Sequence, residues 1–168
     1  MAVGQTYFER FLGLAEEGNA SAQALIGKLY ANGEGGVPQD YTEAVKWYRL
    51  AADQGNVDAQ YNLGFMYRNG EGVPQDYAEA VKWFRLAADQ GYTSAQSNLG
   101  LMYANGDGVP RNDVTAYAWW NIAAASGHED AIGNRSILVE SMTPAQIAEA
   151  QQLSTEIFER IQQGNQEQ

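Results

Sequence analysis

The chain has 168 residues, of which 45% are hydrophobic and 18% are charged, and this composition is typical of one globular domain with a hydrophobic core. Its 21 acidic and 10 basic residues give a net charge of −11, which argues against nucleic acid and anionic membrane surfaces as partners. There is no cysteine, so disulfides and thiolate metal sites are excluded, and no apolar run reaches the roughly 18–20 residues that span a bilayer. We therefore expect no membrane insertion. Basic or neutral partners are electrostatically easier to bind, unless the acidic charge serves only solubility.

The first predicted element is a lone helix over residues 6–17 that ends at Gly18. Beyond it, the segments 33–55, 70–91 and 106–127 align with one another, and this unit recurs at an interval of about 36 residues. Each copy places proline, tryptophan and glycine at equivalent positions, namely Pro38, Pro74 and Pro110; Trp47, Trp83 and Trp119; and Gly55, Gly91 and Gly127. A fixed period of this size is typical of a solenoid, because one repeat alone cannot bury its apolar face.

Each repeat is predicted to contain a first helix (helix A), a Gly–Pro loop and a second helix (helix B) that stops at a glycine. In the second repeat, residues 59–70 carry apolar side chains at helical spacing, and Gly70 and Gly72 are expected to end helix A. The proline of the loop keeps the chain extended. Helix B then covers residues 77–90, with Asp76 as its N-cap.

The two ends of the chain are predicted to carry capping helices. The lone N-terminal helix resembles a helix B without its helix A. After the third repeat, residues 129–140 occupy the position of a further helix A, and Thr143 with Gln146 predicts the start of a final helix. We predict a single solenoid domain over residues 1–168: an N-terminal capping helix (5–18), three repeats (20–55, 56–91 and 92–127), a C-terminal capping helix pair (128–163) and a frayed tail (164–168).

The repeated pattern A-x-x-x-L-G-x-x-Y-x-x-G-x-G-V-P-x-D-x-x-x-A-x-x-W-x-x-x-A-A-x-x-G resembles the Sel1-like repeat, a relative of the tetratricopeptide repeat with a longer loop. The second repeat matches at Ala59, Leu63, Gly64, Tyr67, Gly70, Gly72, Val73, Pro74, Asp76, Ala80, Trp83, Ala87, Ala88 and Gly91. The first repeat departs from it with Ile26 in place of leucine, and the third has Asn112 in place of the acid, with Asp113 next. The resemblance runs from Ala20 to about Leu153 and includes the closing segment that begins MTPAQ.

This resemblance implies an all-α fold, a right-handed α-solenoid of stacked antiparallel helix pairs of the TPR/Sel1-like kind. It also implies adaptor-type protein binding, often in bacterial envelope or host-contact pathways. It does not name a partner. The localisation therefore stays open between a bacterial periplasm or cell envelope and the cytoplasm. The first residues do not form a signal peptide, but a leader removed earlier would leave the same start.

Comparison of the repeats separates constant from variable positions in helix A. The constant or conservatively exchanged positions are predicted to form the core: Ala22, Ala59 and Ala95; Ile26, Leu63 and Leu99; Gly27, Gly64 and Gly100; Leu29, Met66 and Met102; and Tyr30, Tyr67 and Tyr103. The glycines among them would let helix B approach closely. The variable positions fall on one arc of the helix, at about 100° per residue. They are Ala24, Tyr61 and Ser97; Leu25, Asn62 and Asn98; Lys28, Phe65 and Leu101; and Ala31, Arg68 and Ala104.

We predict that this variable arc lines a concave groove that binds a peptide or protein segment. The predicted partner-binding residues are Lys28, Tyr61, Asn62, Phe65, Arg68, Asn98 and Leu101. Aromatic residues and arginine often anchor interfaces, and Asn62 and Asn98, with Asn134 in register, would form a row of amides for an extended backbone. The variable arc is predicted to be free of packing constraint, and neutral drift on such a solvated face is the alternative to a binding groove. The carboxylate clamp of tetratricopeptide repeats is not carried over, because too few suitable side chains are present.

The repeated tryptophans are predicted to pack between repeats rather than stack on a ligand. Helix B of the first two repeats carries charged residues on its outer side, spaced for mild ion pairs: Glu43, Lys46 and Arg49, and Glu79, Lys82 and Arg85. The third repeat has uncharged residues there. We expect the final helix to fold over this helix B and cap the solenoid, the alternative being a second chain.

Nothing in the sequence marks an active site. His128 is the only histidine and is expected to cap a helix or lie exposed, and no metal-binding motif is recognisable. The Ser-x-x-Lys motif is absent, and the Gly-rich loops lack the strand and lysine of a phosphate site. We therefore expect no enzymatic activity, no cofactor and no metal.

The favoured function is a non-enzymatic protein–protein interaction scaffold or adaptor, whose partner is a protein or peptide and which is a monomer rather than a homodimer. A structural or self-associating module is the alternative, and a consensus-engineered repeat protein without a native partner would show the same features. A hydrolase or antibiotic-binding protein is a third hypothesis, for which the sequence supplies no motif.

Overall fold

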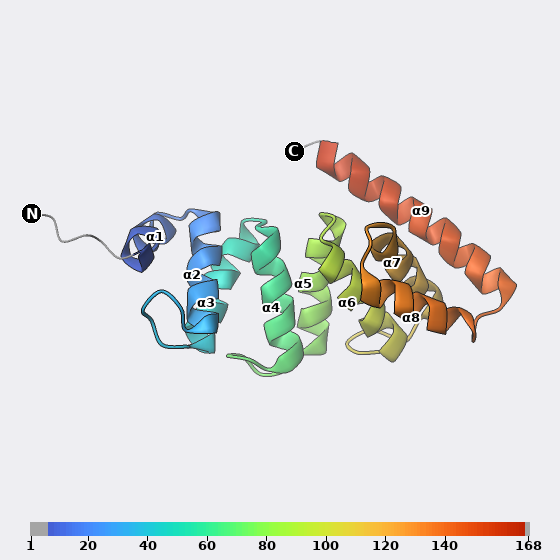
Figure 1. Cartoon of the computed structure of the whole chain (residues 1–168), viewed down its shortest axis with the longest axis horizontal. Helices are drawn as coiled ribbons and strands as arrows, with labels where there is room; N and C mark the ends of the chain where they lie inside the picture. The colour runs from blue at the N-terminus through green and yellow to red at the C-terminus, as the bar shows by residue number, and fades with distance from the viewer. Residues whose placement is uncertain (1–6, 167–168) are drawn as a thin grey trace, which may run out of the picture. The chain divides into compact units, whose positions relative to one another are not determined.

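The computed structural model describes residues 7–166, and this part of the chain consists of helices joined by loops, without strands (Figure 1). The helices are α1 (Tyr7–Glu16), α2 (Ala20–Asn32), α3 (Tyr41–Asp53), α4 (Val57–Asn69), α5 (Tyr77–Asp89), α6 (Thr93–Asn105), α7 (Asp113–Ala125), α8 (Glu129–Val139) and α9 (Pro144–Gln166). The predicted all-α solenoid of consecutive helix pairs is confirmed. The chain divides into two compact units, Met1–Asp76 and Tyr77–Gln168.

Each unit is built from helices that pack on their neighbours along the chain. In the first unit, α2 and α4 are A helices; α1 packs on α2, α2 on α3, and α3 on α4. In the second unit, α5 packs on α6, α6 on α7, and α7 on both α8 and α9. The two C-terminal helices thus both pack on α7, which is the main partner of α9.

Local capping signals set the helix ends. The Asn19 and Asn56 side chains each accept a hydrogen bond from a backbone N–H in the first turn of α2 and α4, at 2.9 Å. Asn112 caps α7 in the same way at 2.9 Å, so its replacement of the usual acid preserves the cap. At the start of α9, Thr143 and Gln146 form the predicted reciprocal capping box.

Two helical glycines allow close contact between helix A and helix B, as predicted. A Cβ atom on Gly27 would lie 2.8 Å from Cδ1 of Tyr48, and one on Gly100 would lie 2.6 Å from Cδ1 of Trp120. The Trp120 indole nitrogen also donates a hydrogen bond to the Ser97 carbonyl oxygen at 3.0 Å. An aromatic ring of helix B thus lies directly on the backbone of helix A, which any larger side chain would prevent.

Gly72 and Gly108 have a role that the sequence did not reveal. We expected Gly72 to help end helix A, but Gly70 alone forms the C-cap of α4, with its N–H bonded to the Met66 carbonyl. Gly72 instead has a φ of +70° and lies so close to the start of α3 that a Cβ would be 2.3 Å from the Tyr41 carbonyl oxygen. Gly108 has the same relation to Tyr77, with 2.4 Å to its carbonyl carbon. These glycines therefore let the A–B loop pass against the preceding helix B.

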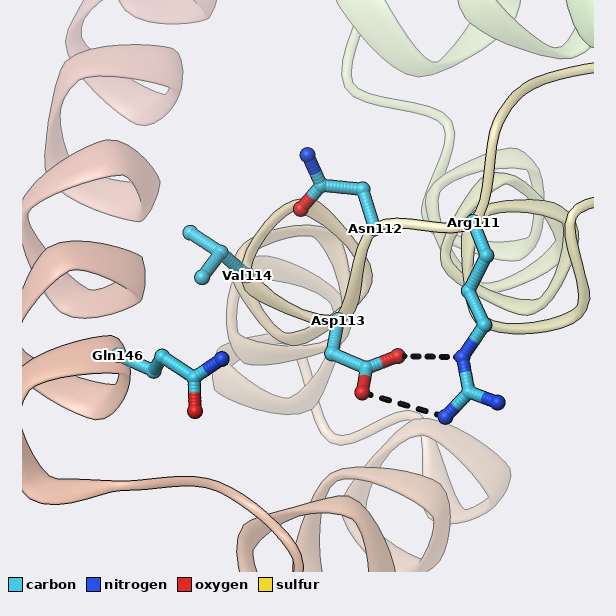
Figure 2. Close-up of a pocket in the computed structure, with 5 residues that line it drawn as sticks. All are labelled: Arg111, Asn112, Asp113, Val114 and Gln146. Carbon is cyan, nitrogen blue, oxygen red and sulfur yellow. Dashed lines mark hydrogen bonds and ion pairs between the residues drawn. The ribbon is translucent and has the colours of Figure 1, made fainter.

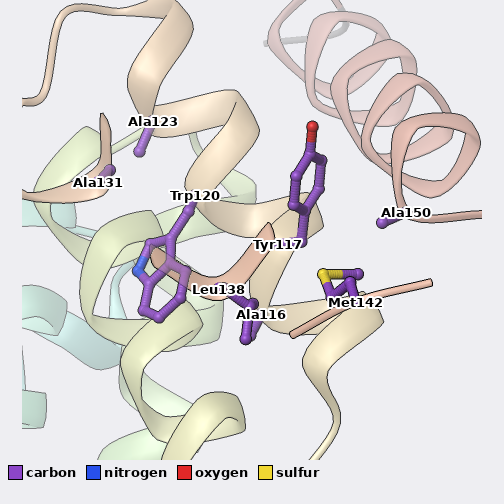
Figure 3. Close-up of a cluster of buried hydrophobic side chains, with 8 residues drawn as sticks. All are labelled: Ala116, Tyr117, Trp120, Ala123, Ala131, Leu138, Met142 and Ala150. Carbon is purple, nitrogen blue, oxygen red and sulfur yellow. The ribbon is translucent and has the colours of Figure 1, made fainter. Parts of the chain in front are cut away.

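A hydrophobic cluster lies where α7, α8 and α9 meet. It contains Ala116, Tyr117, Trp120 and Ala123 of α7, Ala131 and Leu138 of α8, and Met142 and Ala150. Figure 3 shows Ala150 on α9 and Tyr117 and Trp120 on α7 among these side chains. The prediction that the final helix covers the uncharged helix B of the third repeat is confirmed.

The repeated tryptophans are core residues, as predicted. Trp83 and Trp119 are buried, and Trp47 packs against a cluster of Ala15, Ala22, Ile26 and Leu29 formed by α1 and α2. Trp83 and Trp119 are therefore closed to a stacking ligand, whereas Trp47 is half-buried.

The prediction of a frayed tail over residues 164–168 is wrong for the part that the structure describes. Helix α9 continues to Gln166, and residues 167 and 168 lie outside the described residues. Arg160 forms an ion pair with Asp89 at 2.8 Å, and Asn165 lies near Gly91. The last turns of α9 therefore have neighbours in the second unit that were not apparent from sequence.

Tyr48 makes the stability of the fold depend on pH. Its burial beneath Gly27, and secondarily the charge of Asp58, raises the pKa of its hydroxyl well above the ordinary value. The native protein therefore holds this proton more tightly than the unfolded chain, whose tyrosine titrates near pH ~10. The stabilising contribution is fully present below that pH and is lost as the pH rises further.

We expect urea unfolding to show a steeper loss of stability above pH ~10 in the wild type than in Tyr48→Phe. Equal slopes would contradict this.

Candidate functional site

Five of the seven predicted binding residues lie in the first unit, on α2 and α4. These two A helices lie side by side, with α3 packed against both (Figure 1). Phe65 of α4 is a large apolar side chain with 38% of its surface exposed, and Lys28 at the equivalent position of α2 is exposed. Tyr61, Asn62 and Arg68 are half-buried. The first unit therefore presents an aromatic ring and an exposed cation at equivalent positions of neighbouring helices.

The predicted amides are held by their own helices. The Asn62 side chain donates a hydrogen bond to the Asp58 carbonyl oxygen at 2.8 Å, and Asn98 donates to that of Ser94 at 2.9 Å. Each amide therefore has a defined orientation and has already used one donor. Asn134 is half-buried at the equivalent position of α8. The amide groups are thus less available to a peptide backbone than the sequence suggested.

The variable arc of helix A is not free of packing constraint, contrary to the prediction. Ser97 is buried, and its carbonyl accepts the Trp120 indole N–H. Leu101, a predicted binding residue, is half-buried and packs against the cluster of α7, α8 and α9. Leu25 packs against the cluster of α1 and α2. The arc is wider than the exposed strip of the helix, because each helix A contacts more than one neighbouring helix.

A recurring buried glutamine was missed by the sequence analysis. Gln23, Gln60 and Gln96 are buried, and each side chain donates to the carbonyl oxygen eight residues earlier, in the preceding helix B. The three distances are 3.0, 3.2 and 3.3 Å. A polar residue constant in all three repeats, within an otherwise apolar stretch, was the signal that could have identified it. Its role is to join consecutive helices, since a buried amide requires a partner.

Two arginines that were predicted to form ion pairs on the outer side of helix B instead contact the next helix A. The guanidinium of Arg49 lies 5.6 Å from the ring centre of Tyr67 and donates to its hydroxyl. Arg85 and Tyr103 repeat this arrangement at 5.7 Å. Tyr67 and Tyr103 were predicted to be core residues but are half-buried. The hydroxyl of each accepts a hydrogen bond from an arginine, whose guanidinium also lies near the ring. Each of these arginines therefore joins a helix B to the helix A that follows it.

A shallow cavity of about 390 Å³ lies between the start of α7 and α9. Arg111, Asn112, Asp113, Val114 and Gln146 line it (Figure 2). Arg111 donates two hydrogen bonds to the carboxylate of Asp113, at 3.0 and 3.2 Å, and this contact raises the pKa of the guanidinium. The arginine and the aspartate neutralise each other, and Asn112 and Gln146 cap α7 and α9. The polar groups of these residues are thus engaged in an ion pair and in helix caps.

The remaining candidates for chemistry have ordinary structural roles. His128 is the N-cap of α8, where its Nδ1 accepts a hydrogen bond from the Ala131 N–H at 3.4 Å. No group of His, Asp and Glu residues within 7–166 is arranged to hold a metal ion. Over the same residues, no helix combines the length and the apolar character needed to cross a membrane.

Comparison with protein families gives a match along most of the chain. The model of the Sel1 repeat matches residues 20–56, 57–92 and 93–128 in succession. Among curated proteins, a segment of 59 residues is 37% identical to the ERAD-associated E3 ubiquitin-protein ligase component HRD3B of Arabidopsis thaliana. This segment is 35% of the chain and only 10% of that protein.

Solved structures give similar folds. A Sel1 repeat protein from Oxalobacter formigenes is 38% identical with a TM-score of 0.69, and the match covers 76% of this chain and 95% of that one. The Escherichia coli protective antigen c5321, which displays an SLR fold, is 30% identical with a TM-score of 0.71, over 92% of this chain and 41% of that one. Helicobacter pylori cysteine rich protein B, 21% identical with a TM-score of 0.59 over 77% of this chain and 98% of that one, is similar in fold alone.

Proposed function

Because the chain belongs to the Sel1 repeat family, a non-catalytic scaffold fold whose members generally mediate protein–protein interactions, we propose that it is an adaptor that binds a peptide or protein segment on its A helices. In the first unit this surface is the exposed face of α2 and α4, with Lys28, Tyr61, Asn62, Phe65 and Arg68. In the second unit Asn98 and Leu101 occupy the equivalent face of α6. The plant relative is itself a component of a larger assembly, which supports a role in contacts with other proteins.

The observation that carries this proposal is the exposure of Phe65. Its equivalents in the other repeats are Lys28 and Leu101, so the repeat does not require an aromatic ring at this position for packing. A phenylalanine held on a rigid helix, beside Tyr61 and Arg68 one turn away on either side, has the composition of an interface anchor. Lys28 forms no ion pair with another described residue, so its charge faces solvent and is available to a partner.

We expect the triple variant Tyr61→Ala, Phe65→Ala and Arg68→Ala to lose capture of partner proteins while it remains folded. The reason is that hot-spot side chains of this kind each cost roughly 1–4 kcal/mol of binding when truncated. The measurement is affinity capture from lysate of the source organism, with quantification by mass spectrometry. Circular dichroism and thermal unfolding report on the fold.

The matched control is a triple variant on the outer side of α3, Tyr41→Ala, Lys46→Ala and Leu50→Ala. It removes an aromatic, a cationic and an aliphatic side chain, all of them exposed. This control should capture the same proteins as the wild type. Undiminished capture by the first variant, or equal loss by the control, would refute the assignment of the binding face.

A further inference from the structure

Helix α1 is a helix B in its packing as well as in its sequence position. Gln23 of α2 donates to the Ala15 carbonyl of α1 in the same way that Gln60 donates to Ala52 of α3. The backbone bond from Asn19 to Leu14 likewise repeats the bond from Asn56 to Ala51. Position 15 of α1 therefore corresponds to position 52 of α3, and the rest of α1 follows in register.

This register identifies the face of α1 that would contact its own helix A. Tyr7, Phe11 and Leu14 occupy the positions of Ala44, Tyr48 and Ala51 in α3. In α3 all three positions are buried, and Tyr48 lies on Gly27 of α2. In α1, by contrast, 58% of Tyr7 and 41% of Leu14 are exposed, and Phe11 is half-buried with its ring 4.6 Å from that of Tyr7. Tyr7 and Leu14 are thus open to solvent at positions that helix B uses for its core, whereas Phe11 between them packs partly on the cluster of Ala15, Ala22, Ile26 and Leu29.

Helix α8 shows the opposite half of the same interface. Ile132, Gly133 and Ser136 occupy the positions of Gln96, Ser97 and Gly100 in α6. In α6 these residues are buried, and Trp120 of α7 lies on two of them. In α8 all three are exposed, because α9 packs on α7 and does not take the place of a helix B beside α8. Helix α8 is therefore a helix A whose face for helix B is open.

We propose that these two faces join in pairs between copies of the protein, so that α1 of one copy packs as helix B against α8 of the next. The contact is the one that the fold already uses between α2 and α3 and between α6 and α7. In the first repeat Gln54 donates to Gln23 at 2.7 Å, and these two positions correspond to residue 17 and to Ile132. Leu14, one turn before residue 17, would therefore lie beside the turn of α8 that carries Ile132. The contact is heterologous, so chains can add end to end.

Two features make this association weak and dependent on conditions. A single helix pair is small compared with the roughly 1,200–2,000 Å² of a stable interface, so assembly requires concentrated protein. Both ends carry a net negative charge, because Glu9, Glu16 and Glu17 outnumber Arg10 in or next to α1, and Glu129 and Asp130 outnumber Arg135 in α8. Added salt should therefore strengthen the association, because it screens this repulsion.

The experiment is sedimentation velocity of the full chain at increasing concentration, for the wild type and for Leu14→Glu and Ile132→Glu. The wild type should sediment faster as concentration rises, and each variant should lower the association constant by at least about tenfold. An equimolar mixture of the two variants should form dimers and nothing larger. Each variant blocks one end and keeps the other, so the mixture restores a single wild-type contact.

The control is Leu86→Glu on α5, since Leu86 is as exposed as Leu14 and belongs to neither open face. This variant should associate like the wild type. A wild type that stays monomeric at millimolar concentration would overturn the proposal. So would association that survives both end variants, or a mixture that remains as monomeric as its components. None of these outcomes depends on the peptide-binding surface of α2 and α4.

Discussion

Replacing Ile157 by alanine is expected to lower the free energy of unfolding by about 2–5 kcal/mol. Ile157 is one of four buried residues of α9, and only 5% of it is exposed. It belongs to the buried face of α9, which packs on α7, so truncation leaves a cavity at a site that neighbouring atoms cannot fill completely. The measurement is urea denaturation followed by circular dichroism, with hydrogen exchange to show whether α9 is released first.

The adjacent Phe158 supplies the control for this prediction. It is larger than Ile157 but 48% exposed, so Phe158→Ala should change the free energy of unfolding by no more than about 0.5 kcal/mol. If both substitutions had equal effects, α9 would not cover α7 through the face that carries Ile157. The hydrogen bond from Asn121 of α7 to Ser154 of α9, at 2.9 Å, supports the same face.

Gly100→Ala is expected to destabilise the protein by about 1–3 kcal/mol, although alanine is the better helix former. The new Cβ would lie 2.6 Å from both Cδ1 and Nε1 of Trp120. The ring of this buried tryptophan would have to shift, and its hydrogen bond to the Ser97 carbonyl would be strained. Thermal or urea unfolding on dilute protein measures the loss.

Gly133→Ala in α8 is the matched control, because it is also a helical glycine. A Cβ at Gly133 would meet no heavy atom within 4 Å. This substitution should leave stability unchanged or raise it by about 0.5–1 kcal/mol, through helix propensity alone. A destabilisation as large as that of Gly100→Ala would show that contact with Trp120 does not explain the glycine of helix A.

The repeat alignment predicted the close approach of helix B at Gly27 and Gly100 but not the roles of Gly72 and Arg49. All four residues recur in the aligned repeats, and recurrence alone does not say what a residue touches. The contact of Gly72 is with Tyr41 at the start of the preceding helix B, and Arg49 reaches Tyr67 in the following helix A. Such contacts depend on how consecutive helices are placed, which side-chain periodicity within one helix does not encode.

The candidate binding face was predicted only in part. Helical periodicity placed Tyr61, Phe65 and Arg68 on one arc, and Phe65 is exposed in the structure. The same arc contains Ser97, which is buried, and Leu101, which packs against the cluster of α7, α8 and α9. An arc that one repeat leaves exposed can be covered in another, because the covering helix belongs to a different part of the chain.

The sequence by itself determined that this protein is a succession of helix pairs with defined ends, because caps, glycines and apolar spacing act within a few residues. The tertiary structure alone decided where α9 lies, since Arg160 meets Asp89 and Asn121 meets Ser154 across long stretches of chain. By placing α9 on α7, it also left the α8 face open to solvent. Caps, glycines and apolar spacing specify each helix locally. Which helix covers a given apolar face depends instead on the packing of all the helices that can reach it.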